Sequence, residues 1–281
     1  MGLDFIFIFK AIIIAIVEGI TEFIPISSTG HMILVGELID FHGTEFINMY
    51  EVVIQLGAIL AIVVLYWKKF LGNTESLFKG EEKGKRFWLM IIVASIPAAI
   101  FGFLFDDLID QYLFSTKTVA IGFVVGGVLL LVIENMFRNK KNKMKVTKEV
   151  EDIGFIQALK VGIFQCLSLW PGMSRSASTI MGGWISGIST GAIAEFSFFL
   201  GIPIMIGASG LKLIKFKGYD IMTGTQWVSL ILGFIVAFLV ALVCVDGFVS
   251  YLKKKPMRVF AIYRIVAGLA LVTLIFLGFI K

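Results

Sequence analysis

The chain has 281 residues, of which 58% are hydrophobic and only 16% are charged. Soluble domains are about half apolar and about a quarter charged, so this composition excludes an ordinary soluble protein and predicts an integral membrane protein. Apolar segments of about 20 residues recur along the chain, which favours membrane-spanning helices over a β-barrel, whose strands alternate over about ten residues. The net charge of +5 is modest. We attribute it to basic cytoplasmic loops rather than to nucleic-acid binding.

The first apolar segment, residues 5–17, is too short to cross a membrane, because as a helix it would extend only about 20 Å. It runs directly into the polar stretch Glu18–His31, which contains a proline. Proline lacks an amide donor and disfavours helix at the residue before it. We therefore expect a re-entrant helical hairpin over residues 5–40, whose second short helix covers residues 27–40. Polar groups at membrane depth are costly and mark a functional site by default.

Six later segments are long enough to cross a hydrocarbon core of about 30 Å. A second interrupted segment, residues 155–170, runs into Pro171 and Gly172 and predicts another re-entrant hairpin over residues 155–187, with its second helix at 174–187. The predicted fold class is an all-α integral membrane protein with six transmembrane helices and two re-entrant helical hairpins. The predicted spans are residues 47–67, 87–106, 118–137, 192–212, 226–250 and 258–280.

Loop charges predict the orientation. Lysine and arginine gather in the loops at 68–86, 138–148 and 253–258, which this topology places on one side. Basic loops mark the cytoplasmic side of a membrane protein. The loop at 106–117 is rich in aspartate and is predicted to face outward. Three lysines disagree with this assignment because they would also face outward: Lys212, Lys215 and Lys217.

An internal repeat relates the two halves of the chain. The segment Glu51–Gly57 recurs as Glu195–Gly201, and offsets of 139 to 147 residues also pair Ser27 with Ser174. Each half holds one hairpin and three spans. Because three is odd, the second half starts on the opposite side of the membrane, which predicts inverted topology. Inverted repeats with broken helices place a site near the membrane midplane, where the halves meet. The predicted single membrane domain, 1–281, comprises a first repeat at 1–138, a basic cytoplasmic linker at 139–151 and a second repeat at 152–281.

The residue types in the two polar stretches predict phosphate chemistry. Glu18 and Glu22 lie four apart and share a helix face. In a low-dielectric site such a pair needs a cation, a metal ion or a proton, so both are candidate metal ligands. Arg175 is the only arginine in either interrupted segment, and its planar fork suits bidentate binding of phosphate. His31 follows Ser28 by three residues and has the chemistry of a base or a nucleophile near neutral pH.

Hydroxyl groups surround both predicted helix breaks, and a helix start offers free amide donors to an anion. Two alternatives to a phosphate site are that the serines are ordinary helix caps, or that the glutamates form a proton or ion relay. We expect mainly structural or interfacial roles for His42, Gln55, Glu51, Glu195, Asp246 and Arg264. The candidate catalytic residues are Glu18, Glu22, Ser28, His31 and Arg175, and the candidate phosphate-binding residues are Ser27, Thr29, Ser174, Arg175, Ser176 and Thr179.

At these residues the chain resembles the undecaprenyl-pyrophosphate phosphatase family, the bacterial bacitracin-resistance membrane phosphatases. The family signatures occur as E-G-x-T-E-F-x-P-x-S-S-T-G-H at Glu18–His31 and as P-G-x-S-R-S-x-x-T at Pro171–Thr179. The resemblance implies hydrolysis of undecaprenyl pyrophosphate to the monophosphate and inorganic phosphate, which recycles the lipid carrier for cell-wall synthesis and confers bacitracin resistance. It places functional residues at Glu18, Glu22, Ser27, Ser28, His31, Ser174, Arg175, Ser176 and Thr179.

The resemblance also implies a divalent cation such as Mg²⁺, with Ca²⁺ as an alternative, and a homodimer in the bacterial plasma membrane. We hypothesise that the pyrophosphate enters from the outer leaflet, so that the site opens to the extracellular or periplasmic side, while the prenyl tail stays in lipid. The residues leave three possibilities for the attacking group: Ser28, His31, or a water activated by His31. They also leave two other functions open, a transporter or lipid flippase and a bacitracin-binding or scaffolding protein.

Overall fold

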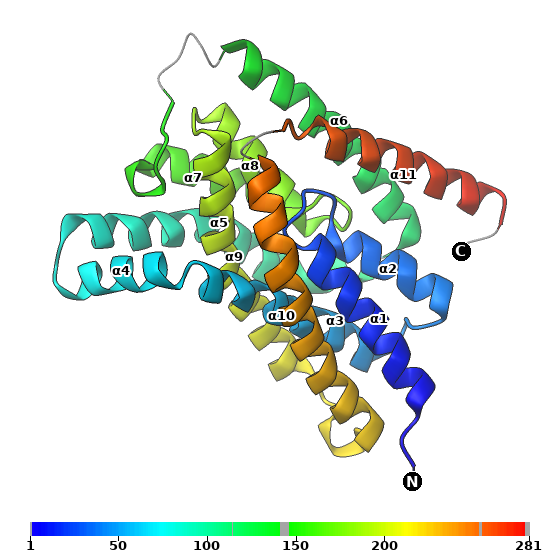
Figure 1. The fold of residues 1–281 in the computed structure, drawn as a ribbon. Coiled ribbons are helices and arrows are strands. Elements are labelled where there is room, and N and C mark those ends of the chain that lie inside the picture. Colours follow the sequence, from blue (N-terminus) through cyan, green and yellow to red (C-terminus); the bar gives the residue numbers. More distant parts are fainter. Residues whose placement is uncertain (1, 114, 141–145, 253–254, 279–281) are drawn as a thin grey trace.

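A computed structural model of the chain describes residues 2–113, 115–140, 146–252 and 255–278. Residues 141–145 and 253–254 of two predicted basic loops, and 279–280 of the predicted sixth span, lie outside the described residues. Within the described ranges the fold is helical and has no β-strand, apart from an isolated bridge between Thr147 and Ile188 (Figure 1). The α-helices are α1 (Phe5–Thr21), α2 (Ser28–Ile39), α3 (Glu45–Leu65), α4 (Trp67–Phe78), α5 (Glu82–Leu113), α6 (Thr116–Lys140), α7 (Phe155–Gln165), α8 (Arg175–Ile185), α9 (Thr190–Lys215), α10 (Gly224–Leu252) and α11 (Arg258–Phe276).

Six of these helices are long and apolar enough to cross a membrane, and they are the six that the sequence predicts: α3, α5, α6, α9, α10 and α11. The largest difference in bounds is at α5, which starts at Glu82 and ends at Leu113 rather than covering 87–106. Polar residues continue the helix at both ends beyond its apolar part. Apolar length therefore identifies the spans but understates how far their helices extend.

Two pairs of shorter helices occur where the predicted breaks lie. Helix α1 ends at Thr21 and packs against α2, which begins at Ser28. Helix α7, followed by a short 3₁₀ turn at Cys166–Leu169, packs in the same way against α8, which begins at Arg175. Both interrupted apolar segments are therefore helical hairpins whose connecting turns carry the polar stretches.

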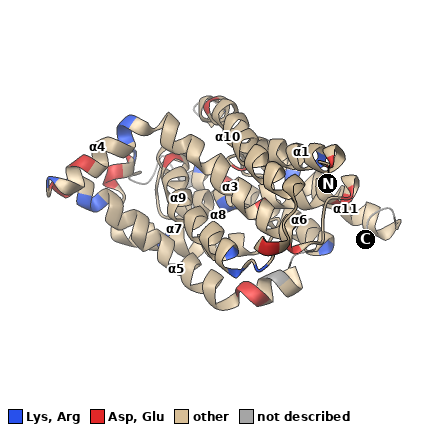
Figure 2. Cartoon of the chain, turned by 90° about the horizontal axis from the view of Figure 1, so that it is seen from below, with Lys and Arg blue, Asp and Glu red and all other residues tan. Residues whose placement is uncertain are grey.

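The sequence-based prediction lacks helix α4. This helix lies in the first basic loop and projects from the bundle together with the start of α5, and it carries both acidic and basic residues (Figure 2). Its charges interrupt any long apolar pattern, which is why hydropathy does not detect it. One exposed ion pair on it, Lys79–Glu75 at 2.7 Å, spans one helical turn. Such exposed pairs contribute little to stability.

The predicted basic loops lie together at one end of the molecule, which we call the basic end. Lys69 of α4 pairs with Glu195 at 2.5 Å and with Glu151 at 3.4 Å. Burial acts to lower the pKa of Lys69, but its bonds to these carboxylates outweigh burial and raise that pKa above its usual value. Near the start of α11, the Met257 amide donates to Glu134 of α6 at 3.0 Å. These contacts join all three basic loops at the same end.

Two of the three lysines that disagreed with the predicted orientation, Lys212 and Lys215, lie beside acidic partners. Lys215 pairs with Asp106 at 2.8 Å and with Asp107 at 3.0 Å, and Lys212 lies 3.7 Å from Asp106. The end of α9 therefore lies beside the aspartate-rich end of α5. These two lysines therefore complement the charge of the acidic loop.

Reciprocal glycine contacts join the two halves of the chain. Helices α6 and α11 lie side by side (Figure 1), and they cross where Gly127 faces the Ala261 carbonyl and Gly268 faces the Ala120 carbonyl. A Cβ atom at either glycine would lie within 3.0 Å of the opposing oxygen. The hairpins are exchanged as well: α1 packs on α10, and α7 packs on α5. Each half therefore packs extensively against the other.

The α6–α11 crossing predicts a large effect of one methyl group. We expect Gly127→Ala to lower stability by about 1–3 kcal/mol, the usual cost of overpacking, because the new Cβ would lie 2.8 Å from the Ala261 oxygen. Gly247→Ala is the matched control, since a Cβ there meets no atom within 4 Å. Thermal unfolding in detergent measures both variants. Equal midpoints for the two would show that the crossing is not tightly packed.

Candidate active site

The two hairpin turns meet at a buried ion pair. Glu22 caps the end of α1, and Arg175 is the first residue of α8. The Arg175 Nη2 atom lies 2.8 Å from Glu22 Oε1, and both side chains are buried. The other Glu22 oxygen accepts a hydrogen bond from the Ser28 hydroxyl at 2.6 Å. Three predicted catalytic residues are therefore directly connected, although they lie as much as 153 positions apart in sequence.

Arg175 is held from its other side by a residue that the sequence analysis did not identify. Its Nη1 atom donates to the Ser197 carbonyl of α9 at 2.7 Å. The Ser197 hydroxyl in turn lies 2.7 Å from the Thr179 hydroxyl. The only sequence signal for Ser197 is its place inside the repeated segment Glu195–Gly201, which otherwise contains mostly apolar residues. The Ser197 carbonyl, held in place through the Ser197–Thr179 contact, thus orients the guanidinium toward Glu22.

The two helix starts share an uncommon backbone conformation. Ser27 and Ser174 cap α2 and α8 and have φ values of 75° and 68°. Positive φ is rare outside glycine and indicates a turn that its surroundings hold in place. Each hydroxyl accepts from the backbone amide three residues later, at 3.4 Å and 3.3 Å. The two serines are helix caps, and they occupy matching positions in the predicted repeat.

The remaining hydroxyls lie around these turns. Ser176 lies 3.1 Å from the Ser174 hydroxyl and donates to the Ile24 carbonyl at 3.4 Å, which is a second contact between the hairpins. Thr29 is half-buried at the next position after Ser28. The centre of the cluster is nearly closed to solvent, because Ser28 is 6%, His31 9% and Arg175 8% exposed. The arrangement is a compact polar site inside an apolar bundle.

His31 is turned away from the Ser28 hydroxyl that we expected it to reach. Its Nδ1 atom lies 2.7 Å from the Ser27 carbonyl, and its Nε2 atom lies 2.7 Å from the Tyr263 hydroxyl of α11. Both ring nitrogens are therefore occupied, and Ser28 bonds to Glu22 instead. Tyr263 carries no sequence signal, since it is an ordinary aromatic residue in an apolar helix.

Arg264 fixes the second turn from the neighbouring position of α11. It is fully buried, and its Nη2 atom donates to the carbonyls of Gly172 at 2.8 Å, Met173 at 3.0 Å and Gly122 at 3.1 Å. The structural role that we expected for Arg264 agrees with these contacts. The contacts also connect it to the site, because Gly172 and Met173 lead directly into Ser174 and Arg175.

Glu18 is a carboxylate of the site whose two oxygens are both unsatisfied among the residues that the structure describes. It is fully buried beside Glu22 and Ser28, yet neither of its carboxylate oxygens has a hydrogen-bond partner within the described chain. A buried carboxylate without a partner needs a proton or a cation. The described residues contain no cluster of three or more His, Cys, Asp or Glu side chains that could hold a metal alone. Two carboxylates completed by phosphate oxygens and water are, however, a usual Mg²⁺ site, so the donor set fits the expected cation.

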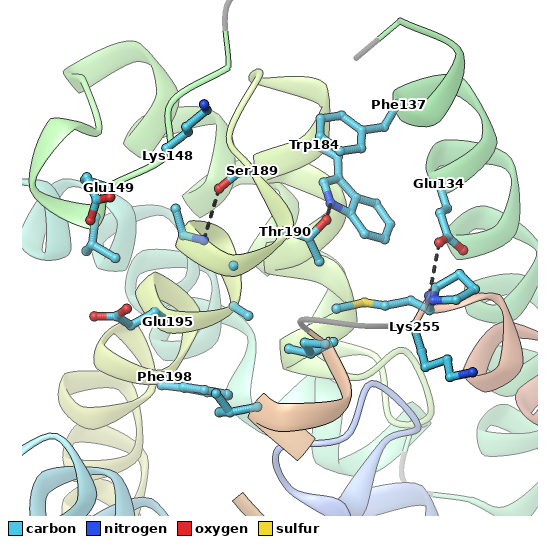
Figure 3. Close-up of a pocket in the computed structure, with 18 of the residues that line it drawn as sticks. Glu134, Phe137, Lys148, Glu149, Trp184, Ser189, Thr190, Glu195, Phe198 and Lys255 are labelled. Atoms are coloured by element: carbon cyan, nitrogen blue, oxygen red, sulfur yellow. Dashed lines mark hydrogen bonds between the residues drawn. The ribbon is translucent and has the colours of Figure 1, made fainter. Parts of the chain in front are cut away.

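A cavity lies elsewhere, at the basic end (Figure 3). It has a volume of about 800 Å³, and none of the predicted site residues lines it. Its wall includes the stacked rings of Phe137 and Trp184, the α9 start at Thr190, and Phe198. Phe198 packs edge-on against Phe23 at 5.6 Å, and Phe23 directly follows Glu22. One aromatic pair thus lies between the cavity wall and the buried ion pair.

Comparisons with known proteins cover almost the whole chain. The family described as bacitracin resistance protein BacA matches residues 11–270. A Clostridium perfringens protein named undecaprenyl-diphosphatase is 60% identical over 98% of this chain and 98% of its own length. A Clostridium tetani protein of the same name is 57% identical over 95% of this chain and 96% of its own. A Clostridioides difficile protein named undecaprenyl-diphosphatase 2 is 57% identical over 100% of this chain and 99% of its own length.

The buried ion pair predicts a non-additive pattern of stability. Arg175→Met leaves Glu22 buried without its cation, which we expect to cost about 3–5 kcal/mol. The double variant Glu22→Gln/Arg175→Met removes both charges and keeps an acceptor for Ser28, so we expect it to be more stable than Arg175→Met alone. Thermal unfolding in detergent compares them, with Lys79→Met as the control that breaks an exposed pair. A double variant less stable than Arg175→Met would contradict a charge-pairing role.

Proposed function

Because the chain belongs to the bacitracin resistance protein BacA family, we propose that it hydrolyses undecaprenyl diphosphate to undecaprenyl monophosphate and inorganic phosphate in the bacterial plasma membrane. The names of its relatives support this substrate. The observation that carries the chemistry is the Ser28 hydroxyl bonded at 2.6 Å to a carboxylate that also meets a guanidinium. We assign these three groups as the nucleophile, the base and the anion receptor of the reaction. The reaction regenerates the lipid carrier for peptidoglycan and removes the target of bacitracin.

The proposed reaction has two steps, with Ser28 as the nucleophile. The Ser28 oxygen attacks the terminal phosphorus while its proton passes to Glu22, and the bond from that phosphorus to the bridging oxygen breaks. Undecaprenyl monophosphate leaves. Water then attacks the phosphoserine, one of its protons returns to the Ser28 oxygen, and the proton on Glu22 passes to solvent. Phosphoryl transfer mainly requires such in-line positioning and neutralisation of charge.

Arg175 is the proposed phosphate receptor, together with the hydroxyls and free amides at the starts of α2 and α8. Its Nη2 atom is bound to Glu22 in the substrate-free chain. A phosphate oxygen takes that place when the diphosphate binds, and Glu22 is then free to accept the Ser28 proton. Guanidinium and phosphate form strong bidentate hydrogen bonds, which favours this exchange. The same contact then stabilises charge that develops in the transition state, usually the largest catalytic term.

Glu18 and Glu22 are the proposed ligands of a divalent cation, Mg²⁺ or Ca²⁺. When bound, this cation would neutralise phosphate charge and thereby favour attack on the terminal phosphorus. The unpartnered oxygens of Glu18 support this assignment, because a cation would give the buried carboxylate a binding partner. Without the cation, Glu18 must carry a proton to remain buried beside Glu22.

We place the two helical hairpins within the membrane as re-entrant elements of an inverted repeat. The matched turns at Ser27 and Ser174, the reciprocal glycines of α6 and α11, and the exchanged hairpin contacts support this topology. The joined basic loops then face the cytoplasm, and the site opens to the outer side. The homodimer that the resemblance implies stays a prediction.

The proposed nucleophile predicts a loss of phosphate release in single variants. We expect Ser28→Ala and Glu22→Gln each to lower kcat by about 100-fold or more, since each removes a partner in the first proton transfer. Ser95→Ala is the control, because its hydroxyl only donates to the Ile91 carbonyl of the same helix. The assay measures phosphate from undecaprenyl diphosphate with purified protein in detergent, where a pure flippase would release none. Near-normal phosphate release by Ser28→Ala would show that Ser28 is not the nucleophile and would favour direct attack by water.

The proposed metal site predicts a shift in metal requirement. Chelation of divalent ions should lower phosphate release, and added Mg²⁺ should restore it. In Glu18→Gln we expect the Mg²⁺ concentration for half-maximal rate to rise by about tenfold or more, because one ligand loses its charge. Glu37→Gln, which removes a partly exposed carboxylate elsewhere in α2, is the control. Full activity in chelator would exclude the metal from the reaction.

A further inference from the structure

His31 has a defined tautomer in this structure. A backbone carbonyl can only accept a hydrogen bond, so the Nδ1 atom that lies 2.7 Å from the Ser27 carbonyl must carry a proton. In the neutral ring, Nε2 then holds the lone pair and accepts from the Tyr263 hydroxyl at 2.7 Å. The hydrogen bond at one ring nitrogen determines the protonation of the other. The Ser27 carbonyl therefore selects the His31 tautomer, and the Tyr263 hydroxyl donates to the remaining lone pair and anchors the ring.

Tyr263 is built into this position by more than one contact. Its ring lies nearly parallel to the His31 ring, at 9° and 5.7 Å between centroids, and Phe123 covers His31 from α6 at 5.2 Å. The Tyr263 side chain is 44% exposed, so its bond to the buried His31 ring lies at the edge of the bundle. The imidazole is thus held between two aromatic rings with both nitrogens bonded. Such a ring has little freedom to rotate toward the ion pair.

The Nδ1 proton of His31 reaches the most strained part of the first turn. Ser27 has a φ of 75°, and its carbonyl accepts both the His31 ring N–H and the His31 backbone amide, the latter at 3.2 Å. The next residue, Ser28, donates to Glu22. A chain of contacts therefore runs from Tyr263 through His31 and Ser27 to the nucleophile.

We infer that Tyr263 is a positioning residue for the reaction: its hydroxyl donates to Nε2 and anchors the His31 ring, and the Nδ1–H of His31 then holds the Ser27 turn that directs Ser28 toward Glu22. The inference rests on the proposed function and deepens it. It makes His31 an orienting group and not the nucleophile, because its only lone pair points at Tyr263. The part of His31 that matters is its N–H donor, which another side chain can supply.

The first test reads the tautomer directly and needs no turnover. The chain has only two histidines, so His42→Gln leaves the ring nitrogens of His31 as the only imidazole signals. With ¹⁵N-labelled histidine, NMR should show a protonated Nδ1 and an unprotonated Nε2. Tyr263→Phe should shift the Nε2 signal, whereas the control Tyr219→Phe, which removes a hydroxyl bonded to the Leu213 carbonyl, should not. A protonated Nε2, or no shift in Tyr263→Phe, overturns the inference.

The second test separates positioning from binding. Tyr263→Phe keeps the ring stack and removes one hydrogen bond, so we expect kcat to fall by about tenfold with KM nearly unchanged. His31→Asn places an amide N–H where Nδ1–H was and should retain measurable activity, whereas His31→Ala should retain much less. In the His31→Asn background, Tyr263→Phe should have no further effect on kcat. Additive losses, or equal inactivity of His31→Asn and His31→Ala, contradict the inference.

The two tests also separate this inference from the function on which it rests. If purified protein releases no phosphate from undecaprenyl diphosphate, the proposed function fails, yet the ring-nitrogen signals still report whether the Tyr263 hydroxyl donates to His31. If phosphate is released and the signals do not respond to Tyr263→Phe, the function stands and the inference fails.

Discussion

The ion pair between Glu22 and Arg175 is the interaction on which the rest of the structure depends. It joins two hairpin turns from opposite halves of the chain inside an apolar bundle. Removing two charges from water costs several kcal/mol per ion, and their attraction offsets this only when the other polar atoms are also bonded. Here Ser28 bonds to the free Glu22 oxygen, and the Ser197 carbonyl accepts from Arg175. The bundle therefore has to hold both turns in register.

Helix α11 holds both hairpin turns in place through two adjacent residues. Tyr263 bonds to His31 and so supports the first turn, and Arg264 binds the carbonyls that precede Ser174 in the second. Both turns contain a serine at positive φ, a conformation that persists only where the surroundings impose it. Because α11 crosses α6 at glycines, its backbone comes close enough to reach both turns. Helix α11 thus stabilises the strained backbone on which the proposed nucleophile and the proposed phosphate receptor lie.

The parts of this arrangement that could be predicted from sequence are those with a local cause. Apolar length identifies the six spans, and proline or glycine after a short apolar run identifies both hairpin turns. That the two hairpin turns meet at one site was predicted from the repeat, since neither segment alone tolerates its charge. Ser197 and Tyr263 could not be found in this way, because a serine or a tyrosine in an apolar helix is unremarkable until its partner is known. The His31–Tyr263 contact joins residues 232 positions apart and depends on the packing of α11.

The closed state of the site bears on which lipid the proposed enzyme would act on. Arg175 has a carboxylate partner already, so a ligand must offer it a better one before Glu22 is released. A diphosphate brings more negative charge than a monophosphate and can engage Arg175 and the starts of α2 and α8 together. After hydrolysis each product carries a single phosphate. The Glu22 carboxylate then competes more successfully with that phosphate for the Arg175 guanidinium. The same ion pair that stabilises the empty site would therefore favour binding of the diphosphate and release of both products.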